Sequence, residues 1–485
     1  MQQGFFFDHW GPGLAQKWLL AVLLCLRCGV ATAVSEKWHT LRHLWITCLG
    51  VWMLVMVVDG KEIMHARTPL FASKPFVVLW NAPTRLCQLR YKVDLDLRTF
   101  KIYANPNDDL SGSTVTIFYH NRLGYYPYLK SPVKPINGGI PQRGNLYKHI
   151  AKVKSDLKKA IPTNQFQGLG VIDWEDWKPQ WMRNVGTRNM YKISSLEPIR
   201  KENPHWSSFR IRSTAKQAFE KAGETFMKNT LIQVKRMRPK GLWGYYLYPE
   251  CHNYNFMVHP DKYTGKCEKL DLKLNDRLLW LWKESTALYP SVHLQHKLQS
   301  SRSSQRFVRY RVMEAMRVAT MARKDYALPV FVYSRPFYAR TFSPLTEEDL
   351  VNTIGESAAL GAAGVVLWGN HRYALSKESC LQLKSYISGP LGRYIINVTS
   401  AATFCSKTLC NMNGRCVRRN SESDAYLHLP SHRYKIVFDN SDARKVLVKG
   451  YLRQKDRKAL KSSFICHCYQ GWKGSACKWP SSSKG

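Results

Sequence analysis

Between residues 66 and 400 the sequence alternates short, continuously apolar runs with segments that repeat apolar residues at helical spacing. The helical period is clearest in residues 146–161 and 213–237. A run that is apolar at every position is typical of a strand buried on both faces, and such strands form parallel sheets covered by helices. Six runs fit this description: PFVVLW (75–80), TVTIFY (114–119), LGVIDW (169–174), GLWGYYLY (241–248), LPVFVY (328–333) and GAAGVVLW (361–368).

The number of strand–helix units indicates the architecture. Six or more units in roughly 330 residues fit an α/β barrel better than an open sheet. No glycine-rich phosphate loop follows the first run, so a nucleotide-binding fold is not supported. A barrel carries its active site at the carboxyl ends of its strands. The acids of VIDWEDWKPQW (171–181) stand at such an end.

Asp173 and Glu175 are two residues apart, and a strand alternates its faces with a period of two. Both carboxyl groups are therefore expected to face the barrel mouth, within a few ångströms of each other, walled by Trp174 and Trp177. A nearby like charge and apolar surroundings both raise the pKa of a carboxyl group. One of the two acids is therefore expected to keep its proton near neutral or mildly acidic pH.

A protonated acid beside a second carboxyl group suits glycoside hydrolysis. Retaining glycosidases usually hold the two groups about 5 Å apart, and parallel neighbours at i and i+2 are too close to straddle a sugar. The spacing favours substrate-assisted chemistry, in which the substrate's own acetamido carbonyl attacks its anomeric carbon. One acid would protonate the leaving oxygen and the other would hold the acetamido nitrogen. The alternative is that Asp173 or Glu175 caps the following helix or pairs with an arginine.

The formal net charge of +39 indicates a polyanionic partner: nucleic acid, an acidic membrane or an acidic polysaccharide. The alternative is a solvated basic surface without a specific partner. Two apolar stretches, residues 18–26 and 44–58, predict export by the secretory path. The first precedes Ala31-Thr32-Ala33, which resembles a signal-peptidase site, and the second is shorter than the roughly twenty residues of a spanning helix.

We expect the mature protein to begin after about residue 60, with a signal anchor as the alternative. The C-terminal KWPSSSKG carries no GPI signal. Three of the thirteen cysteines, Cys25, Cys28 and Cys48, lie in the N-terminal apolar region, and the other ten can form five disulfides in an oxidising compartment. The sequon at Asn397 is compatible with glycosylation. An exported protein does not meet nucleic acid, so an extracellular acidic polysaccharide is the favoured partner.

The last part of the chain, residues 401–480, is rich in cysteine. Its spacing, C-x4-C-x5-C and later C-x-C-x8-C, resembles that of an epidermal-growth-factor-like module. Such modules pair the first cysteine with the third, the second with the fourth and the fifth with the sixth, which implies Cys405–Cys416, Cys410–Cys466 and Cys468–Cys477. A long insertion carries a strongly basic run, residues 443–461. This run is either a solvated loop or a secondary contact for a polyanion.

VIDWEDWKPQW resembles the signature of the hyaluronidase family of glycoside hydrolases, and the likeness extends from about residue 70 to the last cysteine. It is carried by long motifs in the same order: WNAPT (80–84), TIFYHNRLGYYP (116–127), INGGIPQ (136–142), RPKGLWGYYLYPECHNYN (238–255), STALYPS (285–291) and TIGESAALGAAGVVLWG (353–369). These motifs are most similar to those of vertebrate membrane-associated and sperm-type members. The resemblance implies a distorted barrel of about seven strands (66–400) with a C-terminal cysteine-rich module. It also implies retaining endo-hydrolysis of β-1,4 bonds in hyaluronan, and sometimes chondroitin, without a metal or another cofactor.

The resemblance also assigns residue roles. Glu175 becomes the general acid and base, Asp173 shares its proton and positions the acetamido group, and Tyr246 hydrogen-bonds near the acetamido carbonyl. The sugar cleft is expected to be lined by Tyr119, Tyr333 and Trp368, and a substrate carboxylate is expected to meet Arg311. Ordinary barrel packing is the alternative for each aromatic residue. Two barrel disulfides are implied, Cys87–Cys380 and Cys251–Cys267.

Two departures concern substrate preference and pH optimum. Lys178 stands where the family often has arginine, so the charge is kept and the bidentate fork is lost. His293 stands where hyaluronan-active members often have tyrosine, and it is expected to donate a hydrogen bond with a charge that varies with pH. Both residues count as substrate-binding candidates. Met190 replaces a common acidic residue and is interpreted as surface drift.

Two other functions compete with the hydrolase. A glycosaminoglycan-binding or adhesion protein that has lost turnover would suit the +39 charge. The intact set of Asp173, Glu175 and Tyr246 argues against it. A chitinase-type enzyme would carry further aspartates upstream, whereas Gly170, Val171 and Ile172 precede Asp173 here. The sequence leaves open whether the protein is secreted, lysosomal or associated with the cell surface or matrix.

Overall fold

The computed structural model of the chain describes residues 64–132, 134–439, 441–442 and 445–481. These residues belong to one compact unit that begins at Met64. The expectations for the two N-terminal apolar stretches, the signal-peptidase site and the first three cysteines lie outside the described residues. Within the described part, no helix is both long and apolar enough to cross a membrane.

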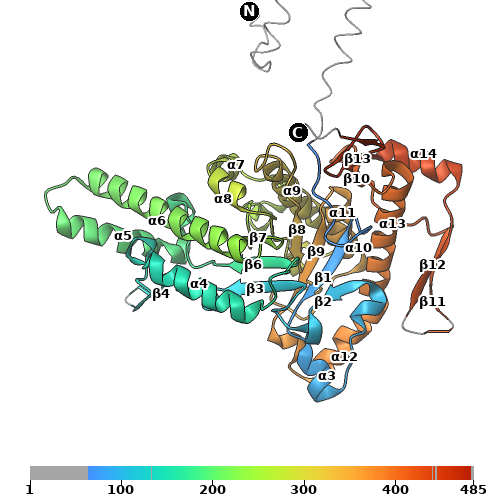
Figure 1. Ribbon diagram of the computed structural model, residues 1–485, viewed down its shortest axis with the longest axis horizontal. Coiled ribbons are helices and arrows are strands. Elements are labelled where there is room, and N and C mark those ends of the chain that lie inside the picture. The colour runs from blue at the N-terminus through green and yellow to red at the C-terminus, as the bar shows by residue number, and fades with distance from the viewer. Residues whose placement is uncertain (1–63, 133, 440, 443–444, 482–485) are drawn as a thin grey trace, which may run out of the picture. The chain divides into compact units, whose positions relative to one another are not determined.

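Each predicted apolar run contains a strand, and all of these strands are parallel to their neighbours. They form two sheets, one in the order β2-β1-β9-β8 and one in the order β3-β6-β7. The strands are β1 (Val77–Asn81), β3 (Val115–Tyr119), β6 (Leu169–Asp173), β7 (Leu242–Tyr245), β8 (Phe331–Ser334) and β9 (Gly364–Trp368), with the short β2 (Ile102–Ala104) in addition. Figure 1 shows these strands at the centre of the molecule, with helices packed around them.

Residues 288–291 join the two sheets. Isolated parallel bridges connect Tyr246 with Tyr289 on one side, and Leu288 with Val330 and Ser291 with Tyr333 on the other. Alternate residues of both sheets meet in one buried cluster, as a period of two requires. Its members include Val77, Leu79, Val115, Ile117, Leu169, Val171, Leu242, Tyr289, Phe331, Tyr333 and Val366. The two sheets therefore share one interior.

The two predicted helical segments form α4 (Leu146–Ala160) and α6 (Ser208–Met237). Each begins at a polar cap, because the side chains of Asn145 and Ser207 accept hydrogen bonds from backbone N–H groups of the first turn. The other helices are α3 (Arg85–Tyr91), α5 (Asn189–Glu202), α7 (Lys269–Asp276), α8 (Leu279–Glu284), α9 (Arg302–Ala319), α10 (Glu347–Leu350), α11 (Glu356–Ala359), α12 (Lys377–Tyr386) and α13 (Gly392–Cys410). In Figure 1, α5 and α6 extend away from the strands as a pair.

The C-terminal region is built on α13, which runs across the expected boundary at residue 401. After it, β10 (Gly414–Arg418) pairs with β13 (Phe464–Cys468). The insertion between them is structured in its described part: it contains the hairpin of β11 (Tyr434–Phe438) and β12 (Val446–Gly450), followed by α14 (Gln454–Ser463). The basic run therefore forms a strand and a helix as well as loop. Short antiparallel pairs complete the fold: β4 (Tyr128–Ser131) with β5 (Lys134–Ile136), and β14 (Trp472–Lys473) with β15 (Trp479–Pro480).

A buried ion cluster ties this region to the helices around the strands. Glu356 is fully buried between Arg309 and Arg418, with a nitrogen–oxygen distance of 2.8 Å to each. Such a charge is costly to bury unless it is paired and hydrogen-bonded, and both conditions hold here. The cluster therefore links α9, α11 and β10.

The described residues contain five disulfides, and they are the pairs that the two resemblances imply. Two lie in the barrel region and three in the C-terminal region: Cys87–Cys380, Cys251–Cys267, Cys405–Cys416, Cys410–Cys466 and Cys468–Cys477.

The sequon residue Asn397 lies inside α13 and is half-buried. Its side-chain oxygen accepts a hydrogen bond of 2.9 Å from the backbone N–H of Leu429. A glycan needs a freely accessible surface asparagine. This placement disfavours the glycosylation that the sequon suggested.

Candidate active site

Five of the predicted site residues lie together at the carboxyl ends of the strands, and we call this end of the two sheets the opening. Asp173 is the last residue of β6 and lies directly beside Tyr119, the last residue of β3. Tyr246 follows β7, while Tyr333 and Trp368 lie on β8 and β9. Because parallel strands end at the same edge, side chains distant in sequence come together here.

Each of these four aromatic residues takes part in a hydrogen bond that reaches another segment. The bonds run from Trp368 Nε1 to Tyr119 Oη (3.1 Å), from Tyr246 Oη to Ser291 Oγ (3.2 Å) and from Tyr333 Oη to Asn81 Oδ1 (3.2 Å). The ring of Tyr246 also meets the ring of Tyr333 edge to face, with centroids 5.1 Å apart. The opening therefore has a fixed aromatic wall rather than mobile side chains.

Of the two acids, Asp173 is the one that keeps its proton. Burial, followed by the charge of Glu175, raises the pKa of Asp173 from 3.8 to about 8. Its Oδ1 is buried and has no hydrogen-bond partner, whereas the Glu175 side chain is exposed. The site thus contains a buried carboxyl group that keeps its proton at neutral pH beside a second acid open to solvent.

The tyrosines around the acids remain protonated. Burial, and then the charges of Asp173 and Glu175, raise the pKa of Tyr119 to about 12 against the lowering effect of the Trp368 hydrogen bond. Burial and the same two acids raise the pKa of Tyr246 well above its ordinary value. A hydroxyl that keeps its proton remains able to donate a hydrogen bond to a ligand oxygen.

The expected wall of Trp174 and Trp177 is wrong. Both indoles are buried in the core behind the strand, stacked with Tyr126 at centroid distances of 4.6 and 5.1 Å. The period of two explains the position of Trp174, because it places the neighbour of Asp173 on the opposite face. Tyr119, Tyr246 and Tyr333, whose pKa values respond to Asp173, wall the acids instead.

Lys178 does not reach the opening. Its side chain is 3% exposed, and its Nζ forms an ion pair of 2.7 Å with Oε1 of Glu250. The other oxygen of Glu250 receives Nη1 of Arg183 at 2.5 Å. The role predicted for Lys178 in substrate binding is therefore at odds with its position. It anchors the loop that follows Asp173 and Glu175.

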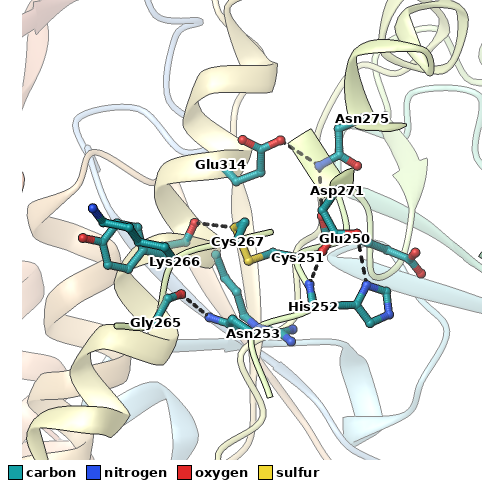
Figure 2. The surroundings of a disulfide bond; sticks show 12 residues. Glu250, Cys251, His252, Asn253, Gly265, Lys266, Cys267, Asp271, Asn275 and Glu314 are labelled. Atoms are coloured by element: carbon teal, nitrogen blue, oxygen red, sulfur yellow. Dashed lines mark hydrogen bonds and ion pairs between the residues drawn. A yellow bond between two sulfur atoms is a disulfide. The ribbon is translucent and has the colours of Figure 1, made fainter. Parts of the chain in front are cut away.

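The loop after β7 is fixed by a disulfide and by polar contacts (Figure 2). Cys251 is bonded to Cys267, and the Asn253 side-chain amide donates to the carbonyl of Gly265 at 2.7 Å. The backbone N–H of His252 donates to Asp271 at 2.5 Å. This loop begins at Tyr246 and contains Glu250, the ion-pair partner of Lys178. It therefore positions both Tyr246 and the loop that follows Asp173 and Glu175.

Arg311 is also placed away from its predicted contact with a substrate carboxylate. It is buried, and its Nε and Nη1 donate to Asn253 Oδ1 (2.8 Å) and to the carbonyl of Ser291 (2.9 Å). Ser291 in turn accepts the hydroxyl of Tyr246. Arg311 thus supports the segment that holds Tyr246.

His293 lies at the opening, but the expectation that its charge varies near neutral pH is wrong. Burial, together with the charges of Arg335 and Arg311, lowers its pKa to about 3. The ring stacks on Trp368 at a centroid distance of 5.8 Å, and its Nε2 is buried without a hydrogen-bond partner. His293 is therefore a neutral ring with one nitrogen that has no hydrogen-bond partner.

The sequence model of the hyaluronidase family matches residues 65–481. The chain belongs to the hyaluronidase family. Among curated relatives, hyaluronidase-1 of Bitis arietans and the hyaluronidase of Crotalus adamanteus are each 53% identical over 437 residues, which cover 90% of this chain and 97% of each relative. The crystal structure of bee venom hyaluronidase in complex with a hyaluronic acid tetramer is 35% identical, has a TM-score of 0.61, and covers 66% of this chain and 98% of its own.

In this hyaluronidase the interpretation of Met190 as surface drift is incomplete. Met190 lies on α5, is half-buried and packs against the main core cluster. An acidic side chain would be poorly accommodated there, because a charge in apolar surroundings needs a partner.

Sequence reasoning missed several residues of the site. Asn81, at the end of β1, holds Tyr333, and Ser291 holds Tyr246. The guanidinium of Arg335 lies 5.1 Å from the ring of Trp368. All three stand at or just after a strand end or sheet-joining segment, which is the signal that could have found them. Within the described residues, no group of three or more histidines, cysteines and acids is arranged to hold a metal ion.

Proposed function

We propose that this hyaluronidase is an endo-β-N-acetylhexosaminidase that cleaves hyaluronan, and also chondroitin, at β-1,4 bonds. The observation that carries the proposal is the buried, protonated carboxyl group of Asp173 beside the exposed Glu175 at an opening walled by tyrosines. The hyaluronic acid tetramer bound to the 35% identical bee enzyme supports the substrate class.

In the proposed reaction the acid pair carries one proton, which Asp173 holds at the start. The proton passes from Asp173 to Glu175, and Glu175 delivers it to the leaving glycosidic oxygen while the substrate's acetamido oxygen forms a bond to the anomeric carbon. Asp173 is then left as a carboxylate that accepts a hydrogen bond from the acetamido N–H, and the hydroxyl of Tyr246 donates toward the acetamido oxygen. This division starts from the raised pKa of Asp173, which makes Asp173 the acid that holds the proton before the reaction.

The second half of the reaction restores the enzyme. Glu175 takes a proton from water, the water oxygen bonds to the anomeric carbon, and the bond to the acetamido oxygen breaks. Two displacements on one carbon retain the configuration. Tyr119, Tyr333, Trp368 and the neutral His293 line the sugar cleft in this scheme.

We also propose that the two sheets form one distorted barrel within residues 66–400 and that residues 401–480 act as an epidermal-growth-factor-like module. The shared interior cluster and the three C-terminal disulfides support these assignments. In the same way we propose that residues 1–60 direct the chain to the secretory path, for secretion or for a lysosomal or cell-surface location, as in membrane-associated and sperm-type members. The five disulfides of the described part suit that oxidising route.

The test is the release of new reducing ends from hyaluronan and from chondroitin over a pH series. The wild type and Glu175→Gln are compared at equal concentration, with circular dichroism as the control for folding. Wild-type activity that falls at least a hundredfold in the variant supports the proposal and ranks the substrates. A folded wild type that cleaves neither polymer would favour the glycosaminoglycan-binding protein instead.

A further inference from the structure

The insertion in the C-terminal region carries cations that the active site does not use. They lie on one face of the β11–β12 hairpin and just beyond it, and they are the half-buried Arg433 and the exposed Lys435, Lys449 and Arg453, together with the exposed ring of Tyr451. We call these five residues the basic hairpin face. In Figure 1 the hairpin and α14 lie beside α13, on the other side of the strands from α5 and α6.

The strand register brings like charges together. Lys435 pairs directly with Lys449, and continuing the same register places Arg433 opposite Tyr451. Directly opposite side chains have Cβ atoms about 5 Å apart, and like charges at such positions destabilise a hairpin. The lysines cannot turn inward, because the other face of the hairpin, with Ile436 and Val448, packs against the main core cluster.

No acid within the described residues neutralises this pair. Asp439 forms an ion pair of 3.4 Å with Lys445, and Asp456 accepts the backbone N–H of Arg453 at the start of α14. Lys435 and Lys449 have no ion-pair partner among the described residues. Among the described residues, the face is therefore a local excess of positive charge without an acid that forms an ion pair with Lys435 or Lys449.

Two further observations point to an anionic ligand. A hollow opens at this face, with the basic side chains of Arg433, Lys435 and Lys449 and the apolar side chains of Val437 and Phe438 in its lining. The Nε of Arg433 is buried without a hydrogen-bond partner. A hydrogen bond from Arg453 and the charges of Arg453 and Arg433 lower the pKa of Tyr451, which is the response of a hydroxyl in a positive field. An anion placed here would satisfy both the cations and the orphaned donor.

We propose that the basic hairpin face binds a strand of anionic polysaccharide at a site separate from the catalytic opening. Same-face residues of a strand recur about every 7 Å, so the cations form a row that suits a polymer with regularly spaced acid groups. The ring of Tyr451 offers an apolar surface to a sugar. The ring of Phe438 at the end of β11 contacts that of Phe100 and is 46% exposed, so binding to a lipid surface is one of the outcomes that the test below separates.

The polymer would be held at two places, one for cleavage and one for retention. The proposal shares the class of polymer with the proposed function and rests on no catalytic residue. Its binding energy comes from exposed charges, so it should weaken steeply with salt.

The test is binding to immobilised chondroitin sulfate, measured as Kd at 0.15 M salt (about physiological) and as the NaCl concentration that elutes the protein. The variant is Arg433→Gln/Lys435→Gln/Lys449→Gln/Arg453→Gln. A double variant, Lys435→Gln/Lys449→Gln, removes two charges from the basic hairpin face. Its control, Lys154→Gln/Lys158→Gln, removes the same number of charges from exposed lysines of α4. We expect about tenfold weaker binding for the quadruple variant, a smaller loss for the double variant, and no change in the control.

Cleavage of short hyaluronan oligosaccharides is measured in parallel and should stay at the wild-type rate in all variants. The proposal is overturned if the hairpin variants elute with the wild type or lose no more affinity than the control. It is also overturned if they lose binding only to phosphatidylserine vesicles, which would assign the face to a membrane. Binding can also be measured with Glu175→Gln, so a failure of the proposed catalysis would leave this result interpretable.

Discussion

Asp173→Asn should stabilise the protein at neutral pH while removing its activity. The carboxyl group has a pKa of about 8 in the fold against an ordinary value of 3.8. An acid with a raised pKa favours the folded state at low pH, and that contribution is lost as the pH rises from about 4 to about 8. Between the ordinary pKa and pH 7 the loss extends over about three pH units. The free energy of unfolding is therefore lower at pH 7 by about 4 kcal/mol.

An amide of the same shape does not titrate, so the variant should avoid this loss. For a chain of this size, 4 kcal/mol corresponds to an increase in Tm of about 4–5 °C. The assay is thermal and urea unfolding of both proteins between pH 4 and pH 8. The difference should be small at pH 4 and should grow by about 1.4 kcal/mol per pH unit. Asp261→Asn, at an exposed aspartate, is the control and should change nothing. A difference between wild type and Asp173→Asn that is zero at pH 7, or constant with pH, would refute the buried protonated acid.

Three further predictions concern the supports of the site. Lys178→Met leaves Glu250 buried with one cation fewer and should cost about 3–5 kcal/mol in urea unfolding, whereas Lys178→Arg should restore most of it; equal stability of both variants would contradict the anchoring role. Cys251→Ser/Cys267→Ser opens a short disulfide loop and should cost about 3 kcal/mol, with an unchanged midpoint as the contrary result. Tyr246→Phe should lower kcat about a hundredfold at constant KM, and a rise in KM alone would show that the hydroxyl serves only binding.

The strands could be predicted because burial on both faces leaves a direct trace in the sequence. All six apolar runs contain a strand, whereas β2, with only three residues, gives too short a pattern. The position of Asp173 could be predicted for the same reason, since β6 ends at this residue, whereas Glu175 lies beyond the strand. The position of Trp174 follows from the same alternation and was available from the sequence.

The roles of charged side chains could not be read in this way, because they depend on partners far along the chain. Lys178 is paired with Glu250, and Arg311 with Asn253 and Ser291. The neutral state of His293 depends on its burial near Arg335. In each case the sequence gives the residue type, and only the fold supplies the neighbour that decides whether it meets a ligand or holds the scaffold.

The most direct test of the proposed mechanism is the configuration of the first product. Hyaluronan is digested in an NMR tube, and the anomeric signal of the new N-acetylglucosamine reducing end is followed before mutarotation. Capture of the anomeric carbon by the substrate's acetamido group, with Asp173 and Glu175 sharing one proton, predicts that the β-anomer forms first. An α-anomer as the first product would mean direct attack by water and would contradict the substrate-assisted mechanism.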